Sequence, residues 1–401
     1  MQDEQQLSII SRLRNRIGFT AAMLVVVSRV LVFEYVLGFG IWYALADGLK
    51  DLSGTPIGAD FINVYAAGLM VWRGQAALVY DWPAHRQVEQ AAAHYASPYF
   101  GWHYPPLFLF VAGLVALLPY LWALALYMVA GFAGYWMVVR HIALRSKESF
   151  WALLAFPGIF INIGNGQNGF ITTALFGGGL LVLEKNPWLA GALFGLLSYK
   201  PQFFVVIPFI LLIGGYGRAC IASVISATAC MGVSWAVFGS VTWQAFFAST
   251  KLTQHIVLEQ GTTGWEKIQS VFSVVRMAGG GITAAYVAQG IVAVAALACA
   301  AFVWQQKTTL ANRAGVLCGA MLLTTPYLMD YDLVVLAVPL AWLAQQGLDK
   351  GFRRYEKLLL SLLWLWPLLA RSVAKFGLPL TPLLLAAMMG LCVGRVRSEE
   401  R

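Results

Sequence analysis

Apolar runs alternate with short polar connectors along the whole chain. Individual runs continue for about 14 to 20 residues with almost no charge, and a helix needs about 20 apolar residues to cross a bilayer. Because backbone polar groups in lipid must be satisfied within their own segment, such runs are typical of membrane helices. The pattern predicts an all-α polytopic membrane protein with about 12 transmembrane helices.

The basic connectors predict how these helices are oriented. Lys and Arg concentrate in connectors such as "RHIALRSK", "QQKTTLANR" and "DKGFRRYEK", which the positive-inside rule assigns to the cytosol. The non-cytosolic face then receives a first loop at about residues 48–103, the turns "GNGQNG" and "SYKPQ", the loop after Phe238 and the segment "TPYLMDYD". We therefore expect the polar chemistry to gather on the non-cytosolic side.

Two segments affect the number of spans. The first apolar run follows three arginines and continues to about residue 46, which is too long for the core of a signal peptide, so we expect it to be retained as a span. Residues 104–118 are too short to cross before the next proline. They are expected to dip into the membrane or to form one kinked element with the following run. No internal repeat is visible, which favours a single integral domain over residues 1–401.

The first loop contains two predicted helices. Residues 61–72, "FINVYAAGLMVW", are apolar all round but too short to span, as suits a helix at the membrane interface, and an amphipathic stretch follows at residues 83–95. Asp60 stands at the N-cap position of the first helix, where a carboxylate accepts backbone N–H groups. Beside a lipid-facing groove it could equally accept a proton from an incoming hydroxyl. The residues alone leave both roles open.

Composition narrows the classes of protein. The chain is 60% hydrophobic and only 11% charged, which excludes a water-soluble domain. Its net charge of +9 lies mainly in short connectors, so a nucleic-acid partner is not expected. The five cysteines are scattered through apolar stretches without paired spacing. His85, His94 and His103 recur every nine residues, which is not the spacing of metal ligands on one helical face.

Two short motifs carry polar groups between apolar runs. "GNGQNG" has the glycine spacing of a dinucleotide-binding loop, but its flanks are membrane helices rather than a βαβ unit. It is therefore either a plain turn or a polar turn that presents the amides of Gln167 and Asn168. In "SYKPQ", Lys200 either snorkels to the membrane surface or faces an anionic substrate group.

Further candidates also have two interpretations. "WHYPPLFLF", which includes His103 and Tyr104, is a rigid entry turn or an aromatic rim around a lipid or sugar. Asp330 and Asp332 cap the next helix or line the cavity. His255, in the later loop, suits an acceptor site or a solvated surface. Arg29 and Glu34, in the first run, could pair or snorkel.

In the order "GADFINVYAAG", "LVYD", "HYPPLFLF", "GNGQNG" and "SYKPQ", these motifs resemble glycosyltransferase family 87, integral membrane enzymes of the C-type superfamily that use polyprenyl-phosphate sugars. The resemblance covers about residues 60–202 and implies a non-cytosolic site in which Asp60 is the general base. The acceptor hydroxyl would attack the anomeric carbon in line and expel polyprenyl phosphate with inversion. The candidate substrate-binding residues are Lys200, Tyr104, Gln167, Asn168, Asp81, His103, Asp330, Asp332 and His255.

The expected partners are a polyprenyl-phosphate-sugar donor, with mannose as the sugar most associated with the family, a lipid or glycan acceptor, and membrane lipids. We expect no cofactor and leave a divalent-cation requirement open. The expected location is the bacterial inner membrane. A transporter or flippase of a lipid-linked or anionic solute is the alternative, but it should place ionisable groups at the midplane and often has repeated halves. Polar groups gathered at one face favour the enzyme.

Overall fold

The computed structural model describes residues 18–144 and 146–399, and every regular element in these ranges is a helix. Six helices are long and apolar enough to cross a membrane: Ala21–Ala44 (α2), Tyr120–Ala143 (α6), Gly217–Glu259 (α13 with η4), Ile282–Gln305 (α15), Asp330–Lys350 (η5 with α17) and Glu356–Lys375 (α18). Shorter apolar helices accompany them. The structure therefore supports a polytopic helical membrane protein without confirming the predicted count of about 12 spans.

The remaining helices are shorter, and all but the last, α19, lie between these six along the chain. They are α3 (Phe61–Trp72), η1 (Ala76–Tyr80), α4 (Trp82–Ala93), η2 (Pro106–Phe108), α5 (Leu109–Val115), α7 (Lys147–Leu154), α8 (Pro157–Gly164), α9 (Gly169–Val182), α10 (Pro187–Leu196), η3 (Leu197–Tyr199), α11 (Pro201–Phe204), α12 (Val206–Ile213), α14 (Val271–Met277), α16 (Leu310–Leu323) and α19 (Thr381–Glu399).

Two of the breaks between short helices coincide with the polar motifs. Residues 165–168 separate α8 from α9, and Lys200 separates η3 from α11. Proline stands at the start of α8, α10 and α11, where its missing N–H costs nothing. Irregular backbone at membrane depth is tolerated where it is buried in protein or lines a cavity. These interruptions therefore point to a site.

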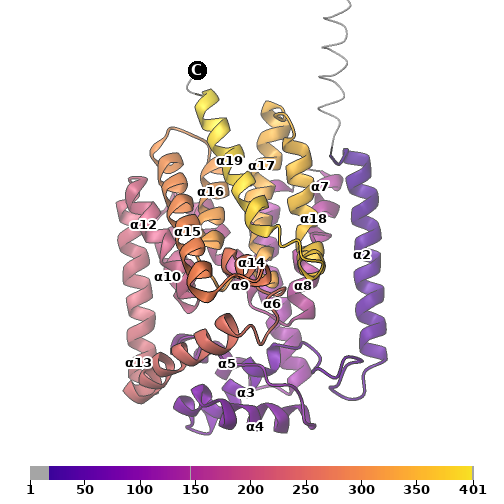
Figure 1. The fold of residues 1–401 in the computed structure, drawn as a ribbon, viewed down its shortest axis with the longest axis vertical. Coiled ribbons are helices and arrows are strands. Elements are labelled where there is room, and N and C mark those ends of the chain that lie inside the picture. The colour runs from indigo at the N-terminus through magenta and orange to yellow at the C-terminus, as the bar shows by residue number, and fades with distance from the viewer. Residues whose placement is uncertain (1–17, 145, 400–401) are drawn as a thin grey trace, which may run out of the picture.

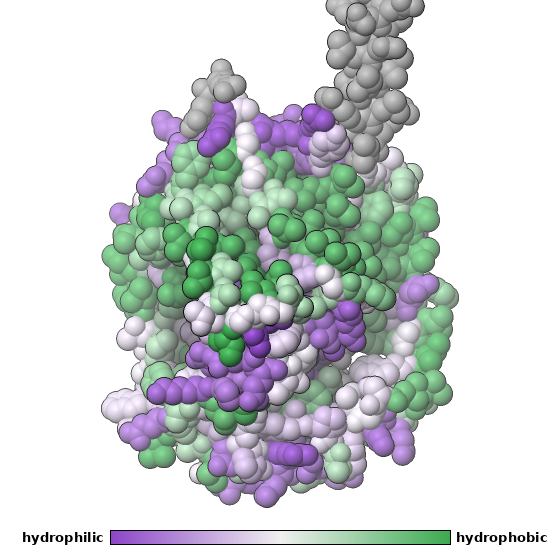
Figure 2. Space-filling view, viewed as in Figure 1, coloured by the Kyte–Doolittle hydropathy of each residue, from purple (hydrophilic) through white to green (hydrophobic). Residues whose placement is uncertain are grey.

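The long helices stand roughly parallel, with α3 and α4 lying across one end of the bundle and the C-terminal end of α19 at the other (Figure 1). An apolar band separates two more polar ends, as expected for a protein that spans a bilayer (Figure 2). Helix α2 stands at the edge of the bundle and packs mainly on α7, where Arg29 lies over the ring of Trp151 at 5.3 Å. That contact gives the unassigned arginine a partner.

Residues 104–118 form only η2 and α5, so this segment is too short to cross, as predicted. Helix α3 packs against α5 and α4, and the indole N–H of Trp72 donates to the carbonyl of Gly113 at 2.8 Å. Eight of the 12 residues of α3 are buried. Its apolar surface is thus covered mostly by protein, whereas the sequence suggested a helix lying in the membrane interface.

The second half of α13 turns back toward α3. Gly239 interrupts the helix with φ 78° and ψ 166°, a conformation open to glycine because it has no Cβ. Beyond Gly239 the chain crosses the lower end of the molecule (Figure 1), where Phe246 packs on Tyr80 of η1 with ring centroids 5.7 Å apart. The kink therefore brings the later loop against the first loop.

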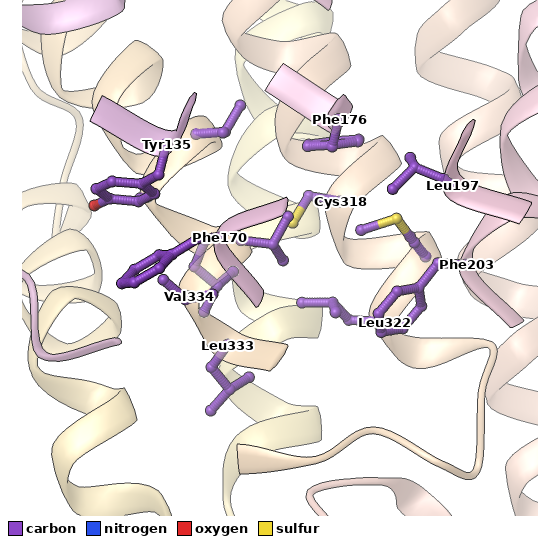
Figure 3. Packing of buried hydrophobic residues seen from close by; sticks show 14 of the residues in the cluster. Tyr135, Phe170, Phe176, Leu197, Phe203, Cys318, Leu322, Leu333 and Val334 are labelled. Atoms are coloured by element: carbon purple, nitrogen blue, oxygen red, sulfur yellow. The ribbon is translucent and has the colours of Figure 1, made fainter. Parts of the chain in front are cut away.

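The apolar core fixes the residues that border the polar breaks. Phe203, three residues after Lys200, lies beside Leu322 of α16, and Leu333 and Val334, directly after Asp332, lie near Phe170 of α9 (Figure 3). All five apolar residues are buried. Packing at near-crystalline density leaves such segments little freedom. Lys200 and Asp332 are thereby held in place from one side.

Candidate active site

A cavity of about 500 Å³ opens between the first loop, the breaks in the short helices and the second half of α13. Its wall includes six of the predicted site residues: Asp60, His103, Tyr104, Gln167, Lys200 and Asp332. The volume is in the range of small-molecule sites. Residues from several of the motifs that carried the family resemblance therefore line the same cavity.

Asp60 does not cap α3. Its own backbone is already helical, with φ −63° and ψ −15°, and its side chain makes no hydrogen bond to the helix N–H groups. The preceding Ala59 has φ 37°, a strained conformation for a residue with a Cβ. This tight entry turns the carboxylate away from the helix end, so the capping interpretation was wrong.

The Asp60 carboxylate instead points at two groups from distant segments. Its Oδ2 accepts a hydrogen bond from Nε2 of Gln167 at 2.8 Å and lies 3.5 Å from Nζ of Lys267. Tyr104 donates its hydroxyl proton to Oε1 of Gln167 at 3.0 Å. Both ends of the Gln167 amide are therefore engaged, which fixes the direction in which it presents its N–H to Asp60.

A glycine makes this arrangement possible. Gly166 has φ 59°, and a Cβ there would lie 2.2 Å from the carbonyl oxygen of Gly58 and 2.7 Å from Cβ of Phe61. No other residue fits between the two turns. The "GNGQNG" turn is thus neither a plain connector nor a nucleotide loop, because its glycine lets it rest on the start of α3 and deliver Gln167 to Asp60.

Lys200 is buried and paired. It is 3% exposed, and its Nζ lies 2.5 Å from Oδ1 of Asp332. The ammonium also lies 5.5 Å from the ring centroids of Phe203 and Tyr331. The snorkelling interpretation is therefore wrong, since a snorkelling lysine would reach the membrane surface. Asp332 lines the cavity and also accepts from the N–H of Met329 at 3.1 Å, so it serves as both cavity wall and cap.

Two cationic residues that sequence reasoning missed also line the cavity. Lys267 lies 5.9 Å from the ring centroid of Tyr331, and Arg371 comes from the end of α18. Lys267 is, like Lys200, a basic residue on the face that the positive-inside rule leaves poor in Lys and Arg. A basic residue on that face is the sequence feature from which Lys267 could have been predicted as a site residue. Tyr331 stands between Lys200 and Lys267, so the three side chains form a cationic wall that Arg371 extends.

Four predicted residues lie outside the cavity lining. Asp81 caps α4 by accepting from the N–H of Ala84 at 2.9 Å. Asn168 and Asp330 are buried, and Asp330 accepts from the N–H of Tyr331 at 2.8 Å. His255 is exposed and contacts Glu259 of its own turn at 3.2 Å. Within the described residues none of these four side chains is hydrogen-bonded to Asp60, but the N–H of Asp330 donates to the carbonyl of Lys267 at 3.1 Å, so Asp330 lies beside the site.

A neutral pair stands behind the cavity wall. Glu89 of α4 accepts from the N–H of Phe100 at 3.0 Å, and its other oxygen lies 3.5 Å from Nδ1 of His85. The Nε2–H of His85 donates to the carbonyl of Asn63 at 3.2 Å. Burial raises the pKa of Glu89 to about 9 and lowers the pKa of His85 to about 4. At neutral pH both groups are uncharged, and together they tie α4 to α3 and to the segment that carries His103 and Tyr104.

A polar cavity with a paired carboxylate, built on helices able to cross a membrane, defines an integral membrane protein with a candidate catalytic site. The family model of glycosyltransferase family 87 matches residues 102–326, more than half of the chain. The chain therefore belongs to glycosyltransferase family 87 and is a glycosyltransferase, which confirms the resemblance. Comparison with curated proteins and with solved structures found no match. The matched range contains Gln167, Lys200 and Lys267 but ends short of Asp332 and begins after Asp60.

Proposed function

We propose that this protein transfers a sugar, mannose in the first instance, from a polyprenyl-phosphate donor to a hydroxyl of a lipid or glycan acceptor at the non-cytosolic face of a bacterial inner membrane. The observation that carries the proposal is the meeting of the Asp60 carboxylate with the cationic residues Lys200, Lys267 and Arg371 around a single cavity, in which the second carboxylate, Asp332, is already paired with Lys200. Displacement of a phosphate by a hydroxyl needs a base for the hydroxyl and positive charge for the phosphate.

Asp60 is the proposed general base. It takes the proton of the acceptor hydroxyl while that oxygen forms a bond to the anomeric carbon, and the bond from that carbon to the phosphate oxygen breaks with its electron pair leaving on polyprenyl phosphate. The hydrogen bond from Gln167 holds the carboxylate in one orientation, and positioning of this kind is a large part of catalysis. Attack in line inverts the anomeric configuration.

The cationic wall is the proposed site of the donor phosphate. Lys267 contacts Asp60, and Arg371 is exposed in the same cavity, whereas Lys200 is buried in the cavity wall and already paired with Asp332. Lys267 and Arg371 are thus placed to contact the phosphate directly, and Lys200 contributes through its field. Charge-assisted hydrogen bonds to the phosphate stabilise it as it leaves.

In-line geometry adds a consequence for Lys267. The nucleophile and the leaving phosphate lie on opposite sides of the anomeric carbon, so the donor sugar must stand between the base and the cation that holds the phosphate. Nζ of Lys267 and Oδ2 of Asp60 are 3.5 Å apart, and this separation leaves no room for a sugar ring. Donor binding therefore opens this ion pair and releases Asp60 for the acceptor.

The proposal is tested by transfer of labelled mannose from polyprenyl phosphate in membranes that contain the wild type or Asp60→Asn. We expect the variant to fold and to lose about 10²- to 10⁴-fold in rate. Asp81→Asn is the matched control, because Asn caps a helix as well as Asp does. Wild-type transfer by a folded Asp60→Asn protein would show that another group is the base. Absence of any transfer or hydrolysis of this donor by the wild type would contradict the donor class.

A further inference from the structure

Asn63 is an unexplained polar residue in the cavity wall. It lies one helical turn after Asp60 on α3, is 4% exposed, and its Oδ1 has no hydrogen-bond partner within residues 18–144 and 146–399. Leaving a buried acceptor unpaired costs about 1–3 kcal/mol. Such a group in a native fold calls for an explanation, and a ligand that binds it is one.

The backbone of Asn63 is held firmly although its side chain is not. Its N–H donates to the carbonyl of Asp60 at 3.2 Å, and its carbonyl accepts from His85 at 3.2 Å. His85 is in turn beside Glu89, which holds the N–H of Phe100. The fold therefore fixes the position of Asn63 relative to the base while its amide oxygen stays without a partner.

Asn63 belongs to a wall of the cavity that carries hydrogen-bonding groups but differs from the cationic wall. This neutral wall consists of Asn63, Tyr99, His103, Ser249, Thr250 and Thr253. Nδ1 of His103 lies 3.1 Å from Oγ1 of Thr253, which joins the first loop to the second half of α13. The lysines and the arginine that line the cavity come from other segments, and Lys200 and Lys267 both face Tyr331.

Asp60 stands between the two walls. It contacts Lys267 of the cationic wall and is one turn from Asn63 of the neutral wall. Because the acceptor attacks from the side opposite the leaving phosphate, an acceptor next to the base lies away from the cation that holds the phosphate. An anionic headgroup in that position would be repelled by the Asp60 carboxylate, and the neutral wall supplies no lysine or arginine to offset the repulsion.

We propose that the neutral wall binds the acceptor, that Asn63 hydrogen-bonds a hydroxyl next to the attacking one, and that the reacting part of the acceptor is an uncharged sugar. This inference rests on the proposed glycosyl transfer. An amide both donates and accepts, which matches neighbouring sugar hydroxyls. The Tyr99 ring, which packs on Trp82 with centroids 5.4 Å apart, adds an aromatic surface to the same wall.

The test uses the full-length protein, labelled polyprenyl-phosphate-mannose and two kinds of acceptor probe: the uncharged octyl α-mannopyranoside and octyl β-glucopyranoside, and the anionic phosphatidylinositol. We expect transfer to an octyl glycoside and not to phosphatidylinositol. Asn63→Ala should raise the KM for the glycoside about 10-fold, as loss of one hydrogen bond predicts, with the donor KM changed less than about 2-fold. Asn63→Leu, of nearly equal volume, should do the same and guards against a folding defect in the first variant.

Asn165→Ala is the control, because the Asn165 amide donates to the carbonyl of Ile161 in its own turn at 2.8 Å and Asn165 is not among the residues that line the cavity. Its glycoside KM should stay at the wild-type value. Transfer to phosphatidylinositol instead of the glycosides overturns the inference, as does an equal rise in donor and acceptor KM in both Asn63 variants. Hydrolysis of the donor without any glycoside product would overturn this inference and leave the proposed function standing. A wild type that never consumes the donor removes the proposed function as well.

Discussion

Two carboxylate–lysine pairs flank Tyr331, and they differ in burial and in distance. Lys200 and Asp332 are both nearly inaccessible and 2.5 Å apart, whereas Lys267 and Asp60 are more exposed and 3.5 Å apart. The first pair is surrounded by core residues such as Phe203 and Leu333. The second faces the cavity. The same combination of carboxylate and lysine therefore forms a fixed part of the cavity wall at Lys200–Asp332 and a contact that is able to open at Lys267–Asp60.

Burial explains the difference. Two charges removed from water are stable only as a pair, so neither Lys200 nor Asp332 is able to leave its partner without a large penalty. A pair at a cavity is screened and exchanges partners at low cost. A phosphate is able to take Lys267 from Asp60, and it cannot take Lys200 from Asp332 so easily. The comparison assigns structure to one pair and chemistry to the other.

The largest expected effect comes from breaking the buried pair. Asp332→Ala leaves Lys200 charged and buried, which should lower the free energy of unfolding by about 3–5 kcal/mol. Thermal unfolding of the detergent-solubilised protein measures this loss. The double variant Lys200→Met with Asp332→Leu should regain most of the stability, because a hydrophobic replacement of a buried pair is often neutral. The donor KM of the double variant should exceed the wild-type value, since the positive charge of Lys200 is gone.

A stable Asp332→Ala protein would contradict the structural role of this pair. A double variant as unstable as the single one would show that packing, and not the unpaired charge, causes the loss. Either result would remove the distinction between the two pairs.

The next effect comes from the open pair. Lys267→Met removes a cation from the phosphate site and should raise the donor KM about 10- to 100-fold, as loss of a charge-assisted hydrogen bond predicts. The free energy of unfolding should change by less than about 1 kcal/mol. Lys251→Met is the control, because Lys251 is exposed on the same segment and lies outside the cavity lining. Equal donor KM values in both variants would show that Lys267 does not bind the donor phosphate.

The sequence predicted the parts of this site that local rules govern. The breaks at "GNGQNG" and "SYKPQ", the one-sided gathering of polar groups and the importance of Asp60 and Lys200 could be predicted from composition, from the cost of charges in membranes and from the family resemblance. Six of the ten predicted residues line the cavity. These features depend on residue type and short-range order, which a sequence displays directly.

The rest depends on backbone geometry and long-range contacts. The strain at Ala59 turns Asp60 from a cap into a cavity residue, and Lys267 contacts Asp60 from a position 207 residues further along the chain. Neither is visible from residue spacing. Asp81 looked like a site residue by motif, but its extended backbone makes it a true N-cap. The predicted number of spans is not confirmed because several apolar helices, such as α9 and α16, are shorter than the length that crosses a bilayer.

The carboxyl group of Glu89 extends the comparison, because the basic side chain nearest to it within the described residues is that of a histidine, His85, at 3.5 Å. Burial raises the pKa of Glu89 to about 9, against a smaller lowering by Arg86. Between pH 4.5 and 9 the unfolded chain releases a proton that the folded protein keeps, so stability falls as the pH rises. The pKa of His85 is lowered to about 4, so above its ordinary value of 6.5 it is neutral in both states and adds no slope.

Glu89→Gln should therefore be less sensitive to alkali than the wild type. From pH 7 to 9 the wild type should lose up to about 1.4 kcal/mol per pH unit more than the variant. Melting temperatures of the two solubilised proteins across this range measure the difference. Parallel curves would mean that Glu89 is ionised in the folded protein.

The smallest effect on stability is expected from a substitution of Asp81. Its carboxylate accepts from a helix N–H group, whereas the carboxylate of Asp60 contacts a lysine. Asp81→Ala loses one cap and should lower the free energy of unfolding by about 1 kcal/mol, with the transfer rate unchanged. Asp60→Asn should do the reverse, with the rate lost and the stability kept, because Asp60 makes no cap bond. Measuring rate and melting temperature on both variants separates the roles. A fall in the transfer rate of folded Asp81→Ala protein would show that Asp81 is a site residue after all. A large loss of stability in Asp60→Asn would mean that the contacts of Asp60 with Gln167 and Lys267 hold the first loop in place.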